Sequence, residues 1–137
     1  MKQPERSLAI VIVLGFTFAM ATSGAATSPL TTVSQPAGLH VTMQSELEPV
    51  TINQMHTWII SVHDTQGEAI NDAVIQVDGG MPLHNHGLAT SPQVTGQPGE
   101  GRYRLQGVRF HMNGEWELRL QIEHAGVPYQ ATFTLTL

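Results

Sequence analysis

Residues 115–122 read EWELRLQI, and this stretch decides the fold. Apolar residues occupy every second position, and charged or amide residues lie between them. Because successive side chains of a β-strand point to opposite faces, this alternation predicts a strand with one buried and one exposed face. Runs that favour strands in the same way occur over residues 39–43, 58–62, 73–77, 90–95, 102–110 and 129–137.

Seven short strands separated by turn signals, within about a hundred residues, are typical of two packed antiparallel sheets. We therefore predict an all-β fold, an immunoglobulin-like antiparallel β-sandwich of about seven strands preceded by a signal peptide. The alternation in residues 102–110 slips by one position at Gly107, which predicts a bulge or bend there. The chain has no cysteine, so apolar burial alone must hold this fold together.

The N-terminus has the three parts of a secretory signal peptide. Lys2 and Arg6 precede an apolar run over residues 8–20, and small residues follow up to Ala26. This pattern predicts a signal peptide over residues 1–26 and a periplasmic or secreted protein. The alternative is an uncleaved segment that anchors the protein to the membrane, and we expect membrane contact only in that case.

The remaining chain is long enough for one domain. Residues 27–38 are rich in Ser, Thr and Pro and are predicted to form a flexible tether, followed by a β-sandwich domain over residues 39–137. After cleavage at Ala26 the protein keeps four arginines against ten acidic residues. This acidic balance, without a basic patch, argues against nucleic acid as a partner.

Residues 81–87, MPLHNHG, are the strongest candidate for functional chemistry. Two imidazoles and a thioether lie within six residues, and a thioether adds affinity mainly for Cu(I). The motif therefore predicts copper before other metals, with zinc as the alternative. Solvated loop histidines and a methionine that fills the core are the competing interpretation.

Strand order predicts that several of these donors converge. In a seven-strand antiparallel sandwich, the third and fifth connections lie at the same end, and these carry His84 with His86 and His111 with Met112. His56 begins a strand at that end, whereas His40, His63 and His124 fall at the other. A tight Asn-Gly hairpin after residue 112 would place apolar residues opposite charged ones, so we expect a longer loop or a crossing between the sheets.

On this basis we rank the candidate ligands. His84, His86 and Met112 come first, His111 next, and Met81 and His56 last. Two imidazoles with a thioether suit three-coordinate Cu(I), whereas Cu(II) would require further nitrogen or oxygen donors. Binding should weaken below about pH 6, because protons and metal compete for the same nitrogen atoms.

At these residues the chain resembles a known family. MPLHNHG at 81–87, GRY at 101–103 and FHMNGEWEL at 110–118 are similar to the YtkA-like domain, a relative of the FixH-like proteins. The resemblance covers residues 55–122 and implies a secreted or membrane-attached immunoglobulin-like domain for copper handling or respiratory oxidase assembly. It implies that the motif residues are His84, His86, Met112 and Trp116. Asn113 departs from the family, which usually has proline there.

Two other functional classes compete with metal binding. The first is a metal-free interaction module that docks a membrane complex, with a membrane protein or an oxidase assembly factor as partner. The second is an enzyme, which we do not expect: Ser61, His63 and Asp64 are crowded on one strand, and no nucleophile motif or phosphate-binding glycine loop is present.

Overall fold

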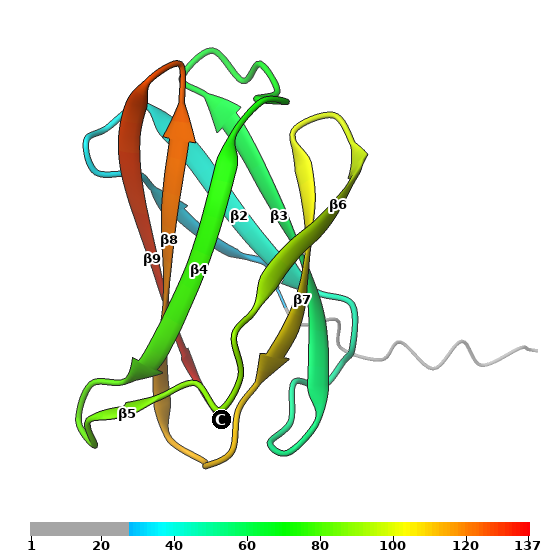
Figure 1. Cartoon of the computed structure of the whole chain (residues 1–137), viewed down its shortest axis with the longest axis vertical. Helices are drawn as coiled ribbons and strands as arrows, with labels where there is room; N and C mark the ends of the chain where they lie inside the picture. The colour runs from blue at the N-terminus through cyan, green and yellow to red at the C-terminus, as the bar shows by residue number, and fades with distance from the viewer. Residues whose placement is uncertain (1–27) are drawn as a thin grey trace, which may run out of the picture.

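The computed structural model describes residues 28–137, which form a sandwich of two antiparallel β-sheets (Figure 1). The nine strands of this part of the chain are β1 (Leu30–Val33), β2 (Leu39–Ser45), β3 (Met55–Asp64), β4 (Val74–Met81), β5 (His86–Gly87), β6 (Gln93–Gly99), β7 (Arg102–Arg109), β8 (Glu115–His124) and β9 (Val127–Thr136). One sheet has the order β1-β2-β3-β7-β6, and the other has the order β5-β4-β8-β9. The predicted all-β sandwich is confirmed.

The alternation in β8 packs one side of this strand into the core. Trp116, Leu118 and Leu120 are fully buried and Ile122 is 1% exposed, while the residues between them are half-buried or exposed. Alternating residues of β2, β3 and β7 supply the facing layer, and they include fully buried Val41, Ile60 and Leu105. The core therefore lies between the two sheets, as period-two patterning requires.

The predicted flexible tether over residues 27–38 is wrong in its middle. Residues 30–33 form β1, which pairs with β2 from Leu30 opposite Met43 to Val33 opposite His40. Beyond this strand, Ser34 is fully buried, and its hydroxyl oxygen accepts a hydrogen bond from the Leu39 N–H at 3.0 Å. Thr31 and Thr32, which suggested a tether, thus lie in an edge strand, and Ser34 lies in a tight connection to β2. The predicted signal peptide, residues 1–26, lies outside the described residues.

Residues 28–137 form nine strands where about seven were expected, because β1 and β5 are both short and were not predicted. The predicted irregularity at Gly107 is confirmed. Trp58 pairs with Leu105 and His56 with Val108, so two residues of β7 oppose one residue of β3. Gly107 has φ +85°, a conformation that residues with a side chain rarely adopt, and it accommodates the extra residue of this bulge.

The connection from β7 to β8 crosses from one sheet to the other, as one of the two alternatives for residues 110–114 required. Phe110 and Trp116 are both fully buried on either side of this connection. The connection lies at the lower end of the molecule in Figure 1, together with β5 and the loop between β2 and β3. Within residues 28–137, no helix is long and apolar enough to cross a membrane.

Candidate metal centre

The histidine motif lies in a hairpin between β4 and β5. Met81 pairs with His86, and Gly80 pairs with Gly87. The four intervening residues form the turn, in which the His84 N–H donates to the Met81 carbonyl at 3.1 Å and Asn85 adopts a left-handed φ of 51°. Directly opposed residues point to the same face of a sheet, so His86 starts from the core-facing side that Met81 occupies.

Two glycines of β4 let this hairpin fold close to the sheet. A Cβ atom on Gly80 would lie 2.5 Å from the His86 carbonyl oxygen, and one on Gly79 would lie 2.8 Å from the Glu117 carbonyl oxygen. Real Cβ atoms do not approach backbone oxygen so closely. The two glycines therefore set the position from which His84 and His86 project.

Three histidines form a row at this end of the sandwich. The ring centres of His84 and His86 are 6.4 Å apart, and those of His86 and His111 are 6.0 Å apart. The first two come from the β4–β5 hairpin, and His111 comes from the connection between β7 and β8. The predicted meeting of two separate connections at one end is confirmed.

Trp116 supports the inner end of this row. Its ring lies edge-on to His111 with ring centres 5.2 Å apart, and its Nε1–H donates to the Met112 carbonyl at 3.0 Å. The Nδ1 atom of His111 is buried and has no hydrogen-bond partner among residues 28–137. A buried nitrogen without a partner has a lone pair or a proton still to satisfy, which a ligand can do.

The methionines differ in accessibility. Met112 is 37% exposed on the loop, with its backbone fixed by Trp116. Met81 is 1% exposed and packs in the core, where its Cε atom fills the space beside Gly114. Of these two methionines, Met112 is therefore the one open to an incoming ion without rearrangement of the core.

The structure does not bring His56 into the row. His56 is 1% exposed, and its Nε2 atom lies 2.7 Å from the Thr51 carbonyl, to which it is close enough to donate. Within the described residues its one ring contact is with Phe110, at 6.0 Å. His40 and His63 pair across β2 and β3, and His124 lies beside Asp72.

A cluster of ion pairs borders the hairpin on the outer face of its sheet. Arg119 contacts Asp78 at 3.1 Å and Glu117 at 2.8 Å. The Gly79 N–H, followed by the Arg119 guanidinium, holds the pKa of Asp78 below its usual value. Hydrogen bonds to Glu117 and then to Asp78 raise the pKa of Arg119. Two carboxylates and one guanidinium give a net negative charge beside the β4–β5 hairpin, which attracts cations.

The donors fit a metal ion only in part. Two imidazoles that share one ion at bond lengths of about 2.0–2.1 Å have ring centres about 5–6 Å apart, and the pair His86 and His111 meets this condition. Within residues 28–137, however, no group of three or more His, Cys, Asp or Glu side chains is arranged to hold a metal ion. His86 and His111 are thus two nitrogen donors at a suitable separation, and Met112 follows His111 directly in the chain.

The sequence identified most of the residues that meet here but not how they are held. Trp116 was present in the motif without a role, and it is the residue that links His111 and Met112 to the core. Gly80 and Gly114 also position the site, since a Cβ atom on Gly114 would lie 2.7 Å from the Met81 Cε atom. The only signal for these residues was their place inside the two motifs.

Comparison with known proteins identifies the family of this chain. A family model described as YtkA-like matches residues 34–121, which include both motifs and most of the sandwich. No curated protein and no solved structure gives a significant match. The chain therefore belongs to the YtkA-like family.

Proposed function

We propose that this protein binds a copper ion, Cu(I) in the first instance, at the end of the sandwich where His84, His86, His111 and Met112 lie. One observation carries the proposal: side chains from two connections far apart in sequence approach to a ring-centre distance of 6.0 Å, His86 with His111. No cysteine can contribute a ligand, because the chain has none. Neutral imidazole with thioether is a donor set that favours Cu(I) over harder ions.

Each donor has a distinct part in this proposal. His86 and His111 would supply the two nitrogen ligands, and Met112 would supply sulfur from the loop that Trp116 fixes. His84 is exposed, with its ring centre 6.4 Å from that of His86, so it would receive an incoming ion or pass it on. Donors at the surface suit an ion that is cargo, and we infer a role in copper handling or respiratory oxidase assembly outside the cytoplasm.

Competitive titration with Cu(I) tests the proposal. Purified protein and a chromophoric Cu(I) chelator would share a limiting amount of metal, under a reductant. We expect one ion per chain, and we expect the double variant His84→Ala/His86→Ala to lose at least tenfold in affinity. The matched control is His40→Ala/His63→Ala, which removes a directly opposed histidine pair from the other end of the sandwich and should keep the parent affinity.

Equal affinity of the parent and the His84→Ala/His86→Ala variant would show that the proposed ligands are wrong. An equal loss in both double variants would mean that histidines bind copper without regard to position. Zinc is the alternative ion, because histidines and water suffice for it. The variant Met112→Leu separates the two ions: it should weaken Cu(I) binding and leave Zn²⁺ binding unchanged.

A second candidate function has its own support. Four exposed apolar side chains lie at this same end: Leu47, Leu83 and Met112 on the connections, and Met55 at the start of β3. Exposed apolar groups near one another often mark a surface that contacts another protein. A metal-free module that docks a membrane complex would use them, and equilibrium dialysis with no retained copper or zinc would favour this function over metal binding.

A further inference from the structure

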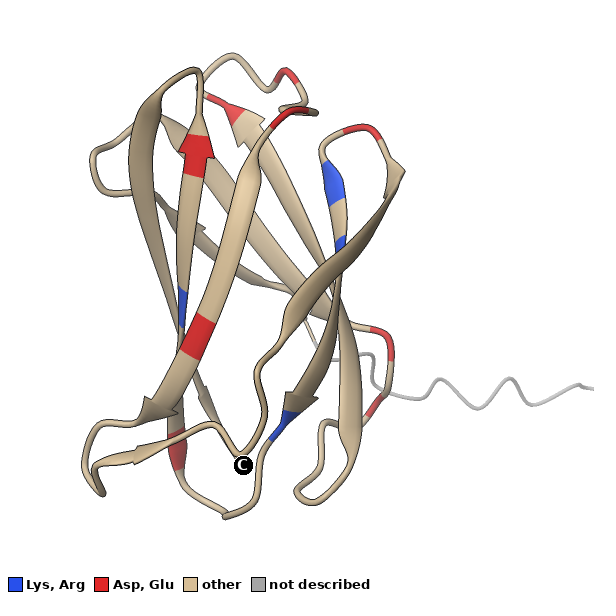
Figure 2. Cartoon of the chain, in the orientation of Figure 1, with Lys and Arg blue, Asp and Glu red and all other residues tan. Residues whose placement is uncertain are grey.

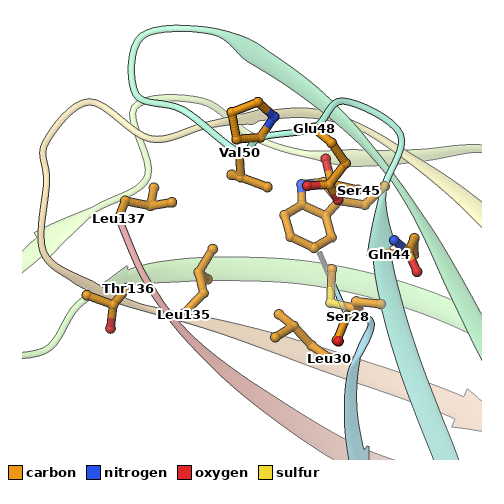
Figure 3. A pocket seen from close by; sticks show the side chains of 12 residues that line it. Ser28, Leu30, Gln44, Ser45, Glu48, Val50, Leu135, Thr136 and Leu137 are labelled. Atoms are coloured by element: carbon orange, nitrogen blue, oxygen red, sulfur yellow. The ribbon is translucent and has the colours of Figure 1, made fainter. Parts of the chain in front are cut away.

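A cavity of about 190 Å³ opens at the same end of the sandwich, beside β1 and β9 and at the opposite edge from β5 (Figure 3). Apolar side chains from both sheets line it: Leu30, Met43, Val50, Trp58, Leu135 and Leu137. Figure 3 shows Val50 projecting toward the middle of the cavity from the loop between β2 and β3. Polar side chains also line it, among them Ser45 and Glu48. The cavity is thus an apolar pocket with a small number of polar groups, as small-molecule sites generally are.

One lining residue has an unsatisfied hydrogen-bond donor. Trp58 is 3% exposed, and its Nε1–H is buried without an acceptor in the part of the chain that the structure describes. The other tryptophan, Trp116, has its donor satisfied by the Met112 carbonyl at 3.0 Å. Leaving a buried donor unpaired costs free energy, so an acceptor inside the cavity would be favoured.

We propose that this cavity binds a small uncharged molecule with an apolar body and one oxygen acceptor, such as a ketone or ester, whose oxygen accepts the Trp58 N–H. The volume sets the size: a cavity of about 150 Å³ holds benzene, so 190 Å³ suits about six to eight non-hydrogen atoms. The apolar side chains that line the cavity disfavour an ionised ligand, because burying a charge without a partner costs free energy. A protonated amine has no lone pair to accept the N–H, which leaves a neutral acceptor.

Nuclear magnetic resonance with two probes of one shape tests the inference. Cyclohexanone and methylenecyclohexane have the same number of non-hydrogen atoms, but only the ketone carries an acceptor. In ¹⁵N-labelled protein the two indole N–H signals report separately on Trp58 and Trp116. We expect cyclohexanone to shift the Trp58 N–H proton downfield with a saturable dependence and to leave the Trp116 signal in place. We expect methylenecyclohexane to move backbone signals of the lining residues without that downfield shift.

The variant Trp58→Phe removes the donor and keeps an aromatic ring. It should weaken cyclohexanone binding about three- to tenfold more than methylenecyclohexane binding, which corresponds to one hydrogen bond. Filling the cavity with Val50→Phe should abolish the binding of both probes. If Val50→Phe fails to fold, the comparison of probes in Trp58→Phe still decides the matter.

Two results would overturn the inference. The first is no saturable change at lining residues with either probe, which would mean that the cavity holds water only. The second is an equal effect of Trp58→Phe on both probes, which would mean that the N–H takes no part. Neither result bears on copper, because the histidine row and its Trp116 support are separate from the lining residues.

Discussion

Trp116 has two structural roles, because its ring packs in the core and its N–H binds the loop that carries two candidate ligands. Its fully buried ring packs in the core against Phe110, with ring centres 5.3 Å apart. On the side of the loop it contacts the ring of His111 and donates to the Met112 carbonyl. A single side chain thereby transmits the rigidity of the core to two candidate ligands.

Trp116→Phe should weaken Cu(I) binding about three- to tenfold, because it removes the hydrogen bond to Met112 while every proposed ligand remains. Competitive Cu(I) titration measures this loss. Leu120→Val is a matched control, a core change in the same strand that leaves the loop contacts in place and should keep the parent affinity. An unchanged affinity in Trp116→Phe would show that the loop does not depend on this bond.

Tyr103 joins two segments of chain through its hydroxyl group. Its O–H donates to the Ile70 carbonyl at 2.6 Å and accepts from the Ala73 N–H at 3.0 Å. Burial, only partly offset by the hydrogen bond from Ala73, raises the pKa of Tyr103 above its usual value of 10.0. Ionisation is therefore less favourable in the folded than in the unfolded protein.

The sign of the pH dependence follows from this shift. A group whose folded pKa is raised contributes stability that is fully present below its unfolded pKa and is lost as the pH rises through its folded pKa. The free energy of unfolding should thus decline from about pH 10 upward. Tyr103→Phe should lower stability by about 1–3 kcal/mol at pH 7 and reduce that decline. Urea unfolding at pH 7 and pH 11 checks both effects, and an equal alkaline loss in parent and variant would contradict the assignment.

The β4–β5 hairpin depends on Gly80, because any side chain at this position meets the backbone of β5. Gly80→Ala should separate Met81 from His86, destabilise the domain by about 1–3 kcal/mol and weaken Cu(I) binding. Thermal unfolding and the Cu(I) titration measure the two effects. Gly96→Ala is the matched control, since a Cβ atom there would have no heavy atom within 4 Å. If the two variants behaved alike, the close approach at Gly80 would not determine the position of the histidines.

At the level of elements, the sequence predicted strands where burial produces a clear alternation. The strand predicted from EWELRLQI and the bulge predicted at Gly107 are both present in the structure, because each follows from local geometry. β5 has only two residues and is defined by its pairing with β4, so it has no period of its own to detect. β1 was not predicted because it lies in a segment rich in Ser and Thr, which suggested a tether. Its pairing with β2 overrides this local composition.

The location of the candidate site could be predicted from the sequence, but its details could not. Strand order placed the two connections at one end, and the close approach of His86 and His111 agrees with that reasoning. The ranking of individual donors was harder to predict from the sequence, because the burial of each side chain depends on the packed core. The burial of Met81 and the hydrogen bonding of His56 to Thr51 appear only when the sheets are assembled.

Over the whole molecule, this end of the sandwich combines two features that the fold keeps apart. The histidine row lies over β5 and the β7–β8 connection, and the apolar cavity lies between the ends of β2, β3 and β9. Gly114 lies on the loop beside the histidine row, and Leu137 lines the apolar cavity. Backbone hydrogen bonds of 2.9 and 3.0 Å join these two residues. Basic residues are sparse across the molecule (Figure 2), which favours cations over anions as ligands.

Binding of Cu(I) should stabilise the entire domain, because the proposed ligands come from the β4–β5 hairpin and from the connection that crosses between the sheets. An ion that binds the folded state alone adds about 2.7 kcal/mol at a free concentration one hundred times Kd. For a domain of this size, that corresponds to a rise in Tm of about 10 °C. The reductant that keeps copper as Cu(I) cannot itself affect the fold through disulfides, since the chain has no cysteine. Calorimetry with and without Cu(I) measures the rise, which should fall by about half or more in His84→Ala/His86→Ala and persist in full in His40→Ala/His63→Ala. A rise of equal size in both double variants would place the stabilising ion elsewhere on the molecule.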